Sequence, residues 1–314
     1  MDRPEDGPTL VSVVIPTRDR DDLLAEALAS VRALEGPDLR LEILVADNGS
    51  SARTRGIVEA AGGRYVRAPE GAAAARNTGL RAATGAYIAF LDDDDVWTTE
   101  HLRPHLRLLR ARPDLAAVVG QVATTDARLG NPGAPWPERL PDDGDVFNSF
   151  LRTYPQMGAT VIRASVRDSV GDLDESLLSD EDWDWHLRLA LRHRVGFVPV
   201  LGVLFRQRPA GVRAELEWRR LPFLRRVLWR NIVRAAGRRP PPTFVARCYL
   251  RHLGGYASYF LDSALAQRAA GDRRAAWRAV RWAVRTSPAH VAAAVARRPE
   301  VRHLLLALIL PTRG

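Results

Sequence analysis

Four consecutive aspartates, Asp92 to Asp95, follow the apolar segment 87–91 and have the composition of a cation-binding site. Adjacent carboxylates repel one another, and this repulsion is costly unless a positive charge neutralises it. Mg²⁺ and Mn²⁺ can do so, because they bind a few carboxylates together with water and substrate phosphate oxygens. Alternation along an extended chain predicts that Asp92 and Asp94 face one side, and Asp93 and Asp95 the other. The competing interpretation is a solvated acidic turn in which one aspartate caps the following helix.

Polar residues suited to ligand binding also follow two other expected strands. Thr17 and Arg18 come after the apolar segment 11–15, and Asp47 comes after the segment 41–46. In an open α/β sheet, ligands sit at the carboxyl ends of the parallel strands. Asp47 can accept the N–H of a pyrimidine ring, while Thr17 and Arg18 can contact a base, a ribose or a phosphate. The alternative is a plain turn, which Asn-Gly-Ser runs after strands commonly form.

The segments that position these residues alternate between strand and helix patterns. Strands are predicted at 11–15, 41–46, 64–67, 87–91, 116–124 and 159–163, with a final strand pair around 195–205. Helices are predicted at 21–31, 53–61, 73–83, 99–112, 146–152 and 183–192. This alternation indicates an α/β fold with a mostly parallel, helix-covered sheet.

Proline and glycine mark a long loop and a domain boundary. Residues 130–144 contain seven Gly or Pro residues and are predicted to form a loop that acts as a lid or binds an acceptor. After Pro209 only helical patterns remain, interrupted at 240–242. We therefore expect an α/β domain over residues 1–212 and an all-helical appendage over residues 213–314.

Six segments together resemble the family 2 glycosyltransferases of the GT-A fold. They are Val11–Arg18, Val45–Ser50, Gly71–Gly79, Gly85–Trp97, Val170–Glu175 and Ser179–Trp183. Their order and spacing agree with the family over residues 10–210. The resemblance implies an inverting transfer of a sugar from a nucleotide-diphosphate donor, with a UDP-sugar expected, to an acceptor hydroxyl. The sequence has no Gln-x-x-Arg-Trp motif, which argues against a processive polysaccharide synthase.

The same resemblance assigns roles to single residues. Asp47 would hold a uracil-type base, Asp92 would contact the ribose or the metal, and Asp94 would be the metal-binding member of the DxD motif. The expected metal is Mn²⁺ or Mg²⁺. The residues expected to bind the donor are Thr17, Arg18, Asp47, Arg76, Asn77, Asp92, Asp93, Arg206 and Arg208.

Asp182, in a Glu-Asp pair before Trp183, would be the general base by this resemblance. A sugar hydroxyl is a poor nucleophile at neutral pH, and a nearby carboxylate can take its proton in the transition state. The alternative is that the polar residues before Trp183 only cap the helix that follows and match its dipole, namely Ser179, Asp180, Glu181 and Asp182.

The sequence departs from the family at Arg206-Gln-Arg208, where many relatives carry an Arg-x-His signature that touches the metal or the diphosphate. Arg208 stands in place of the histidine. It cannot bind a metal, but it can neutralise a diphosphate directly.

Charge is divided unevenly along the chain, whose formal net charge is +9. Residues 1–212 hold 25 Arg and 32 Asp or Glu, a balance of −7, whereas residues 213–314 hold 21 Arg and 5 Asp or Glu, a balance of +16. This basic half is either a helical cap with a solvated Arg face or a surface that meets anionic lipid near a lipid-linked acceptor. Nucleic acid is not expected, because the aromatic residues there fit helix packing better than base stacking.

Further features bear on the compartment. The single cysteine, Cys248, excludes an internal disulfide and is expected to be a buried thiol. The first residues lack an apolar signal-peptide core, and the longest apolar run, Leu304–Leu310, is too short to span a bilayer. A cytoplasmic protein is therefore expected, with peripheral contact to the inner membrane face. The expected acceptor is a glycan, a lipid-linked sugar or a small molecule.

Two other functions compete with glycosyl transfer. A sugar nucleotidyltransferase would need a Gly-rich phosphate loop after the first strand, and residues 17–22 contain no Gly. A non-catalytic protein that binds a membrane or nucleic acid through its basic half would not need both Asp94 and Asp182.

Overall fold

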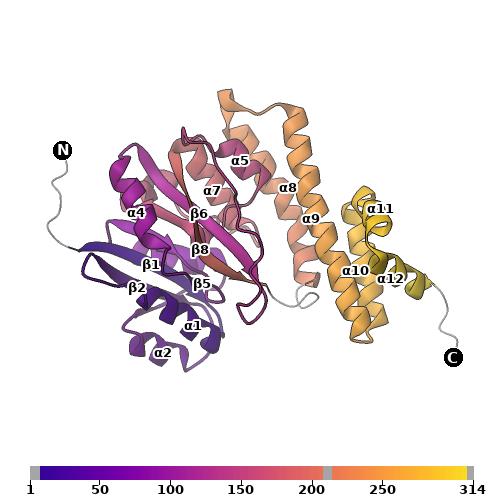
Figure 1. Ribbon diagram of the computed structural model, residues 1–314, viewed down its shortest axis with the longest axis horizontal. Coiled ribbons are helices and arrows are strands. Elements are labelled where there is room, and N and C mark those ends of the chain that lie inside the picture. Colours follow the sequence, from indigo (N-terminus) through magenta and orange to yellow (C-terminus); the bar gives the residue numbers. More distant parts are fainter. Residues whose placement is uncertain (1–7, 208–213, 310–314) are drawn as a thin grey trace. The chain divides into compact units, whose positions relative to one another are not determined.

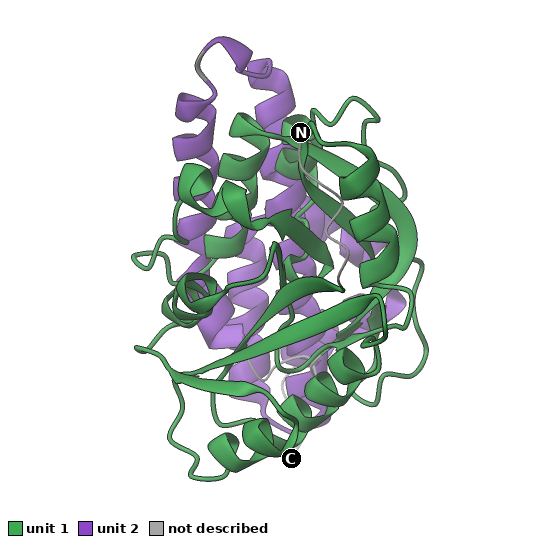
Figure 2. Ribbon diagram, turned by 90° about the vertical axis from the view of Figure 1, so that its left-hand side faces the viewer, with its two compact units in different colours: residues 1–207 green, residues 208–314 purple. Residues whose placement is uncertain are grey.

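A computed structural model describes residues 8–207 and 214–309 of the chain. The chain divides into two compact units, Met1–Gln207 and Arg208–Gly314, coloured separately in Figure 2. The division lies close to the boundary expected near residue 212.

The first unit is built on one eight-stranded sheet with the order β3-β2-β1-β4-β7-β6-β8-β5 (Figure 1). The strands are β1 Thr9–Thr17, β2 Leu39–Asp47, β3 Arg64–Arg67, β4 Tyr87–Phe90, β5 Val96–Trp97, β6 Leu115–Thr125, β7 Thr160–Arg163 and β8 Arg194–Arg206. Four of the seven strand pairs are parallel, which confirms the predicted mostly parallel sheet. Strand β7 lies antiparallel between β4 and β6.

The helices of this unit bury their apolar positions, which recur at helical spacing. They are α1 Asp21–Arg32, α2 Thr54–Ala60, α3 Ala72–Ala82, α4 Leu102–Ala111, α5 Phe147–Arg152, α6 Arg167–Val170 and α7 Glu181–Arg192. Helix α3 packs against β1 and β2, and α4 against β6 and β8. In α1, Leu24, Ala27, Leu28 and Val31 are buried, as the amphipathic pattern predicts.

The predicted strand pair around 195–205 is wrong, because one continuous strand, β8, occupies this segment. The strand contains Pro199 and Gly202, and both fit a continuous strand. Pro199 lies where the register with β6 is irregular, a position that tolerates a missing N–H. Gly202 lets the strand pass the ring of His101, since a Cβ at this position would lie 2.2 Å from His101 Nδ1.

The second unit contains helices only among its described residues, as predicted. They are α8 Ala214–Arg234, α9 Pro242–Ala269, α10 Arg273–Thr286, α11 Pro288–Arg297 and α12 Pro299–Ile309. Helix α9 contacts each of the other four, and its buried Phe260 packs with Trp218 and Trp282. Cys248 is buried, as expected. None of the described helices is long and apolar enough to cross a membrane.

Close contact between α3 and β1 depends on Gly79, which lies on the face of the helix that meets Val14. A Cβ at position 79 would lie 2.3 Å from Val14 Cγ1. We predict that Gly79→Ala lowers the free energy of unfolding by roughly 1–3 kcal/mol, because overpacking outweighs the gain in helix propensity. Urea denaturation measures this change.

Gly56→Ala is the matched control. Gly56 lies inside α2, and a Cβ there would meet no atom within 4 Å. This variant should keep the stability of the parent or gain up to about 1 kcal/mol. Equal effects of the two substitutions would contradict the packing argument.

Candidate active site

The four aspartates after β4 divide into two faces, as alternation predicted. Asp93 and Asp95 are each 3% exposed, whereas Asp92 and Asp94 are partly exposed. Asp93 accepts hydrogen bonds from Thr17 Oγ1 at 2.8 Å and Arg20 Nη1 at 2.6 Å. Asp95 accepts one from the backbone N–H of Arg206 at 2.8 Å. The buried pair therefore fastens the turn to the neighbouring strand ends, and the other pair is left facing outward.

Burial and repulsion between like charges raise the pKa of both buried aspartates. Burial raises the pKa of Asp93 to about 6, with Arg20 opposing the shift and Asp94 adding to it. Burial also raises the pKa of Asp95 well above its ordinary value, and the charges of Asp92 and Asp94 act in the same direction. Both effects arise because a carboxylate is poorly solvated beside others of the same charge.

Arg76 on α3 joins this turn to the start of α7. Its guanidinium donates to Asp92 Oδ1 at 2.6 Å and to Glu181 Oε1 at 2.9 Å, and its side chain is 7% exposed. Burial alone would lower the pKa of Arg76, but the charges of Asp92, Glu181 and Asp182 outweigh it and raise the pKa. Arg76 is therefore a permanently charged link between two acidic segments that are distant in sequence.

Asp182, the predicted base, lies at this link and is partly exposed. Its Oδ1 accepts the backbone N–H of Trp183 at 2.8 Å. Burial raises the pKa of Asp182, the charge of Arg76 opposes the shift, and Asp92 adds to it. The pKa of the predicted base therefore depends on the charge of Asp92, in the predicted metal-binding turn, and on the charge of Arg76.

Asp180 begins α7 in an unusual conformation. Its φ is 60°, in the left-handed region, where Asp and Asn are tolerated better than other residues with a Cβ. Burial raises the pKa of Asp180 to about 7, Asp182 adds to the shift, and the hydroxyls of Tyr154 and Ser179 oppose it. Strained backbone of this kind is common at functional sites.

Asp47 ends β2 with its side chain 1% exposed and already hydrogen-bonded. Its Oδ1 accepts the N–H of Gly49 at 2.7 Å, its Oδ2 accepts the hydroxyl of Tyr65 at 2.9 Å, and Arg67 Nη1 lies 3.6 Å from Oδ2. Tyr65 and Arg67 were not found by sequence reasoning, because the short strand β3 carries no motif. Contact of Asp47 with a base stays a prediction.

Asp19 is a third residue that sequence reasoning missed. Its Oδ1 accepts the backbone N–H groups of Ser50 and Ser51 at 2.6 and 2.8 Å. These bonds hold the loop after β2 against the end of β1, so the two expected donor-binding segments lie side by side. No pattern in the sequence indicated this pairing, since the residues are more than 30 positions apart.

The remaining predicted donor-binding residues have different surroundings. Asn77 bonds both backbone groups of Leu173 and the carboxylate of Glu175. Arg18 is exposed and pairs with Glu70 at 2.9 Å. Arg208 lies outside the described residues. Direct contact of each of these residues with a donor stays a prediction.

Arg206 ends β8 and is nearly buried. Its guanidinium donates to acceptors from three segments, namely the carbonyl oxygens of Asp94 and Ala127 and the carboxylate of Glu26. These bonds position the aspartate turn from the side opposite Thr17. Arg206 can therefore act by positioning the aspartate turn, without contacting a ligand itself.

The described residues contain no group of three or more His, Cys, Asp or Glu side chains able to hold a metal by themselves. A Mg²⁺ or Mn²⁺ site of the kind predicted needs fewer, because phosphate oxygens and water complete it. Asp94 has the carboxylate that such a site needs and is not completely buried, since its side chain is 14% exposed and lies 3.7 Å from Arg20 Nη1. Asp92 is 29% exposed and has one oxygen on Arg76.

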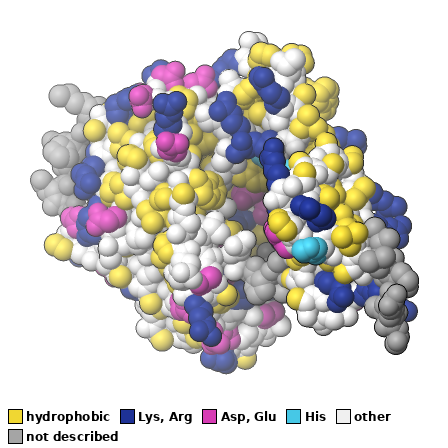
Figure 3. Space-filling model, turned by 45° about the vertical axis from the view of Figure 1, so that its right-hand side comes forward, with side chains coloured by type: hydrophobic (Ala, Val, Ile, Leu, Met, Phe, Trp, Pro, Cys, Tyr) yellow, Lys and Arg dark blue, Asp and Glu magenta, His cyan; other side chains and the backbone are white. Residues whose placement is uncertain are grey.

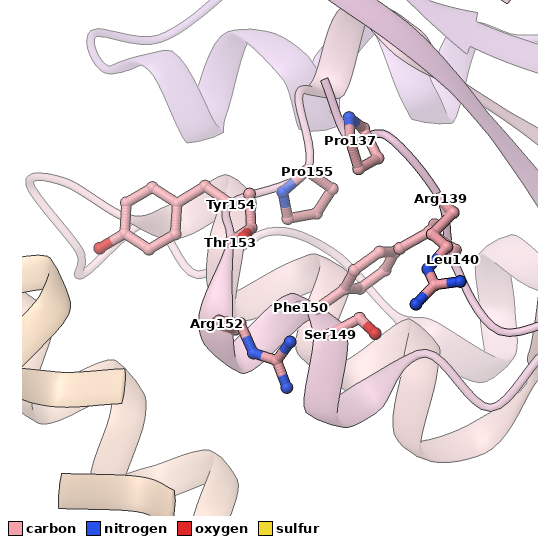
Figure 4. A pocket seen from close by; sticks show the side chains of 9 residues that line it. All are labelled: Pro137, Arg139, Leu140, Ser149, Phe150, Arg152, Thr153, Tyr154 and Pro155. Carbon is pink, nitrogen blue, oxygen red and sulfur yellow. The ribbon is translucent and has the colours of Figure 1, made fainter. Parts of the chain in front are cut away.

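A cavity of about 90 Å³ lies between the predicted loop and α5 (Figure 4). It is lined by Pro137, Arg139, Leu140, Ser149, Phe150, Arg152, Thr153, Tyr154 and Pro155. The rings of Tyr154 and Trp183 lie 4.5 Å apart, and Trp183 Nε1 donates to the carbonyl of Phe150 at 2.7 Å. The cavity therefore adjoins the residue that follows Asp182.

Comparison with known proteins places this geometry in context. Residues 12–166 match the family described as Glycosyl transferase family 2. WfgD of Escherichia coli, a UDP-Glc:alpha-D-GlcNAc-diphosphoundecaprenol beta-1,3-glucosyltransferase, is 34% identical over 105 residues, which are 32% of this chain and 41% of that protein. The match thus spans less than half the length of this relative.

Two solved structures share the fold. S. aureus TarS 1-349 in complex with UDP-GlcNAc superimposes with a TM-score of 0.60 and 16% identity, covering 92% of each chain. The mannosyltransferase PcManGT from Pyrobaculum calidifontis, in complex with GDP-Man and Mn²⁺, gives a TM-score of 0.53 and 19% identity, covering 97% of this chain and 83% of that one. These likenesses confirm the predicted GT-A fold.

The Arg76 link predicts a large stability effect. Arg76→Met would leave Glu181 and Asp92 without their shared cation, and removing one partner of a buried ion pair costs about 3–5 kcal/mol. Urea denaturation measures the free energy of unfolding.

Arg81→Met is the matched control on the same helix. Arg81 pairs with Asp172, and both side chains are about half exposed. An exposed ion pair contributes about 1 kcal/mol or less. If both variants lose the same small amount, Arg76 is not the link described.

Proposed function

Residues 12–166 belong to glycosyl transferase family 2, and from this premise we propose that the protein transfers a sugar from a nucleotide-diphosphate donor to an acceptor hydroxyl. The observation that carries the proposal is the Arg76 link, which joins Asp92 to the segment that bears Asp182. Donor-binding and proton-accepting groups must meet at one anomeric carbon, and this link holds their segments together.

The donor is proposed to be a UDP-sugar bound at the carboxyl ends of β1 and β2. Asp47 and Thr17 would contact the base and ribose, with Arg18 and Arg76 nearer the phosphates. The loop that Asp19 holds in place supports this proposal, because it lies beside Asp47. The UDP-GlcNAc bound by the structurally similar TarS agrees with this class of donor.

Asp94, with Asp92, is proposed to hold Mn²⁺ or Mg²⁺ on the donor diphosphate. The ion would offset the negative charge that grows on the leaving diphosphate. Arg76 supports this role by fixing Asp92 at the edge of the site, and Arg20 by holding Asp93 away from it. Arg206 and Arg208 would add positive charge beside the diphosphate or position the turn that meets it.

Asp182 is proposed to accept the proton of the acceptor hydroxyl. Its raised pKa brings the carboxylate closer to the working range of a general base. Attack from the face opposite the diphosphate would invert the anomeric centre. The cavity beside Trp183 supports an acceptor position here, and its two arginines, Arg139 and Arg152, suit an acceptor that carries phosphate. A lipid-linked sugar has this chemistry, as does the acceptor named for WfgD.

The base assignment predicts a separation of binding from turnover. Asp182→Asn should bind the donor nucleotide as the parent does and lose at least ~100-fold in turnover, because proton transfer is lost. Calorimetry with UDP measures binding, and a panel of nucleotide sugars, with water or acceptor glycans, measures turnover. Loss of nucleotide binding in this variant would remove Asp182 from the proposed role.

The metal assignment predicts a different pattern. Asp94→Asn should abolish transfer and the dependence of UDP affinity on Mn²⁺, while the far-UV spectrum and thermal midpoint stay those of the parent. Asp38→Asn, at an exposed carboxylate paired with Arg103, is the control and should leave activity unchanged. Full activity of the parent in the presence of a chelator would overturn the metal role.

A further inference from the structure

The hairpin of α8 and α9 carries an unbalanced run of positive charge. Residues 218–261 contain ten Arg and no Asp or Glu. The nearest acidic residues on either side of this segment are Glu217 and Asp262. The segment therefore carries ten positive charges and no negative charge of its own, and such a concentration of one sign attracts anionic partners from a distance.

Exposed apolar side chains lie within the same hairpin. Trp229 and Val233 on α8 are 66% and 52% exposed, and Leu250 on α9 is 62% exposed. They are three of the six large exposed hydrophobic residues among those described. A large apolar side chain left in water is informative when it lies among charges of one sign, since packing does not account for it.

On α8 these residues form one stripe. Arg225 and Arg226 are exposed and lie one turn before Trp229, and Val233 lies one turn after it. Residues three or four apart share a face of a helix, so Arg225, Arg226, Trp229 and Val233, called here the α8 stripe, face the same way. Figure 3 shows dark blue basic side chains lying between yellow apolar ones over the C-terminal unit.

This combination matches the interface of an anionic lipid bilayer better than other anionic partners. Tryptophan is favoured at the headgroup level, because its ring is apolar and its N–H can still bond. Arginine attracts anionic headgroups while its stem packs along the apolar layer. A nucleic-acid backbone would use the arginines, but would gain little from an exposed Val and Leu.

We propose that the α8 stripe docks this protein on an anionic lipid surface, with Trp229 inserted at the headgroup level. Docking would bring the enzyme to the surface where a lipid-linked acceptor resides. The inference goes beyond sugar transfer and holds whether or not the first unit is active.

Vesicle co-sedimentation of the full chain, without donor, tests the proposal. Vesicles of phosphatidylcholine alone are compared with vesicles that also contain phosphatidylglycerol, at about 0.05 M and about 0.5 M salt. We expect binding to the anionic vesicles at low salt, little binding to neutral ones, and release at high salt. Absence of binding to anionic vesicles at low salt would overturn the proposal, while leaving the donor experiments unaffected.

Variants locate the contact. Replacing Arg225 and Arg226 together by Gln should weaken vesicle binding about 25-fold, because each Arg near the surface contributes about a factor of five. Trp229→Ser should weaken it about tenfold or more. All three side chains are exposed. The thermal midpoint of each variant is measured beside its vesicle binding, and loss of binding in a variant that keeps the midpoint of the parent locates the contact.

The matched control removes two charges elsewhere in the same unit. Arg297 and Arg302 are exposed on α11 and α12, and replacing both by Gln should change vesicle binding less than about threefold. If this control weakens binding as much as the Arg225 and Arg226 pair, net charge rather than the α8 stripe is responsible. Tighter, salt-dependent binding to duplex DNA than to anionic vesicles would also overturn the lipid assignment.

Discussion

The pairing of the Arg76 guanidinium with Asp92 and Glu181 is the constraint on which the arrangement of the active site depends. A buried cation requires opposite charge within hydrogen-bond distance, because desolvation otherwise costs several kcal/mol. The planar fork of arginine satisfies two carboxylates in fixed directions, which a lysine ammonium would not do. One side chain from α3 therefore bridges the turn after β4 and the start of α7.

The aspartate turn works with this constraint by dividing its four carboxylates. Asp93 and Asp95 face inward and bond to Thr17, Arg20 and the backbone of Arg206, so the turn is held from both neighbouring strand ends. Their raised pKa values reflect the burial of like charges in one place. Asp92 and Asp94 are partly exposed, with Asp92 hydrogen-bonded to Arg76 and Asp94 close to Arg20.

The C-terminal unit is stabilised mainly by the packing of apolar side chains. Its core is a set of aromatic and small side chains around α9, including the stacked rings of Trp218 and Trp282 at 5.7 Å. Most arginines of this unit are exposed, although guanidinium nitrogens of Arg220 and Arg230 are buried. A helical unit of this kind can carry a strongly basic surface without disturbing its own packing.

Local pattern was enough to predict the sheet, nearly all of its helices and strands, the two faces of the aspartate turn and the helical C-terminal region. Each of these depends on the periodicity or composition of a short segment, which the residues carry themselves. The partners of buried side chains were beyond such reasoning. Arg76 and Glu181 are separated by 105 positions, and Asp47 meets Tyr65 only because β3 lies beside β2. The segment predicted as a strand pair is the single strand β8, in which Gly202 leaves room for the ring of His101. Sequence determines which groups are present and how they repeat, but folding alone decides which distant charges share a buried space, since that depends on the packing of whole elements.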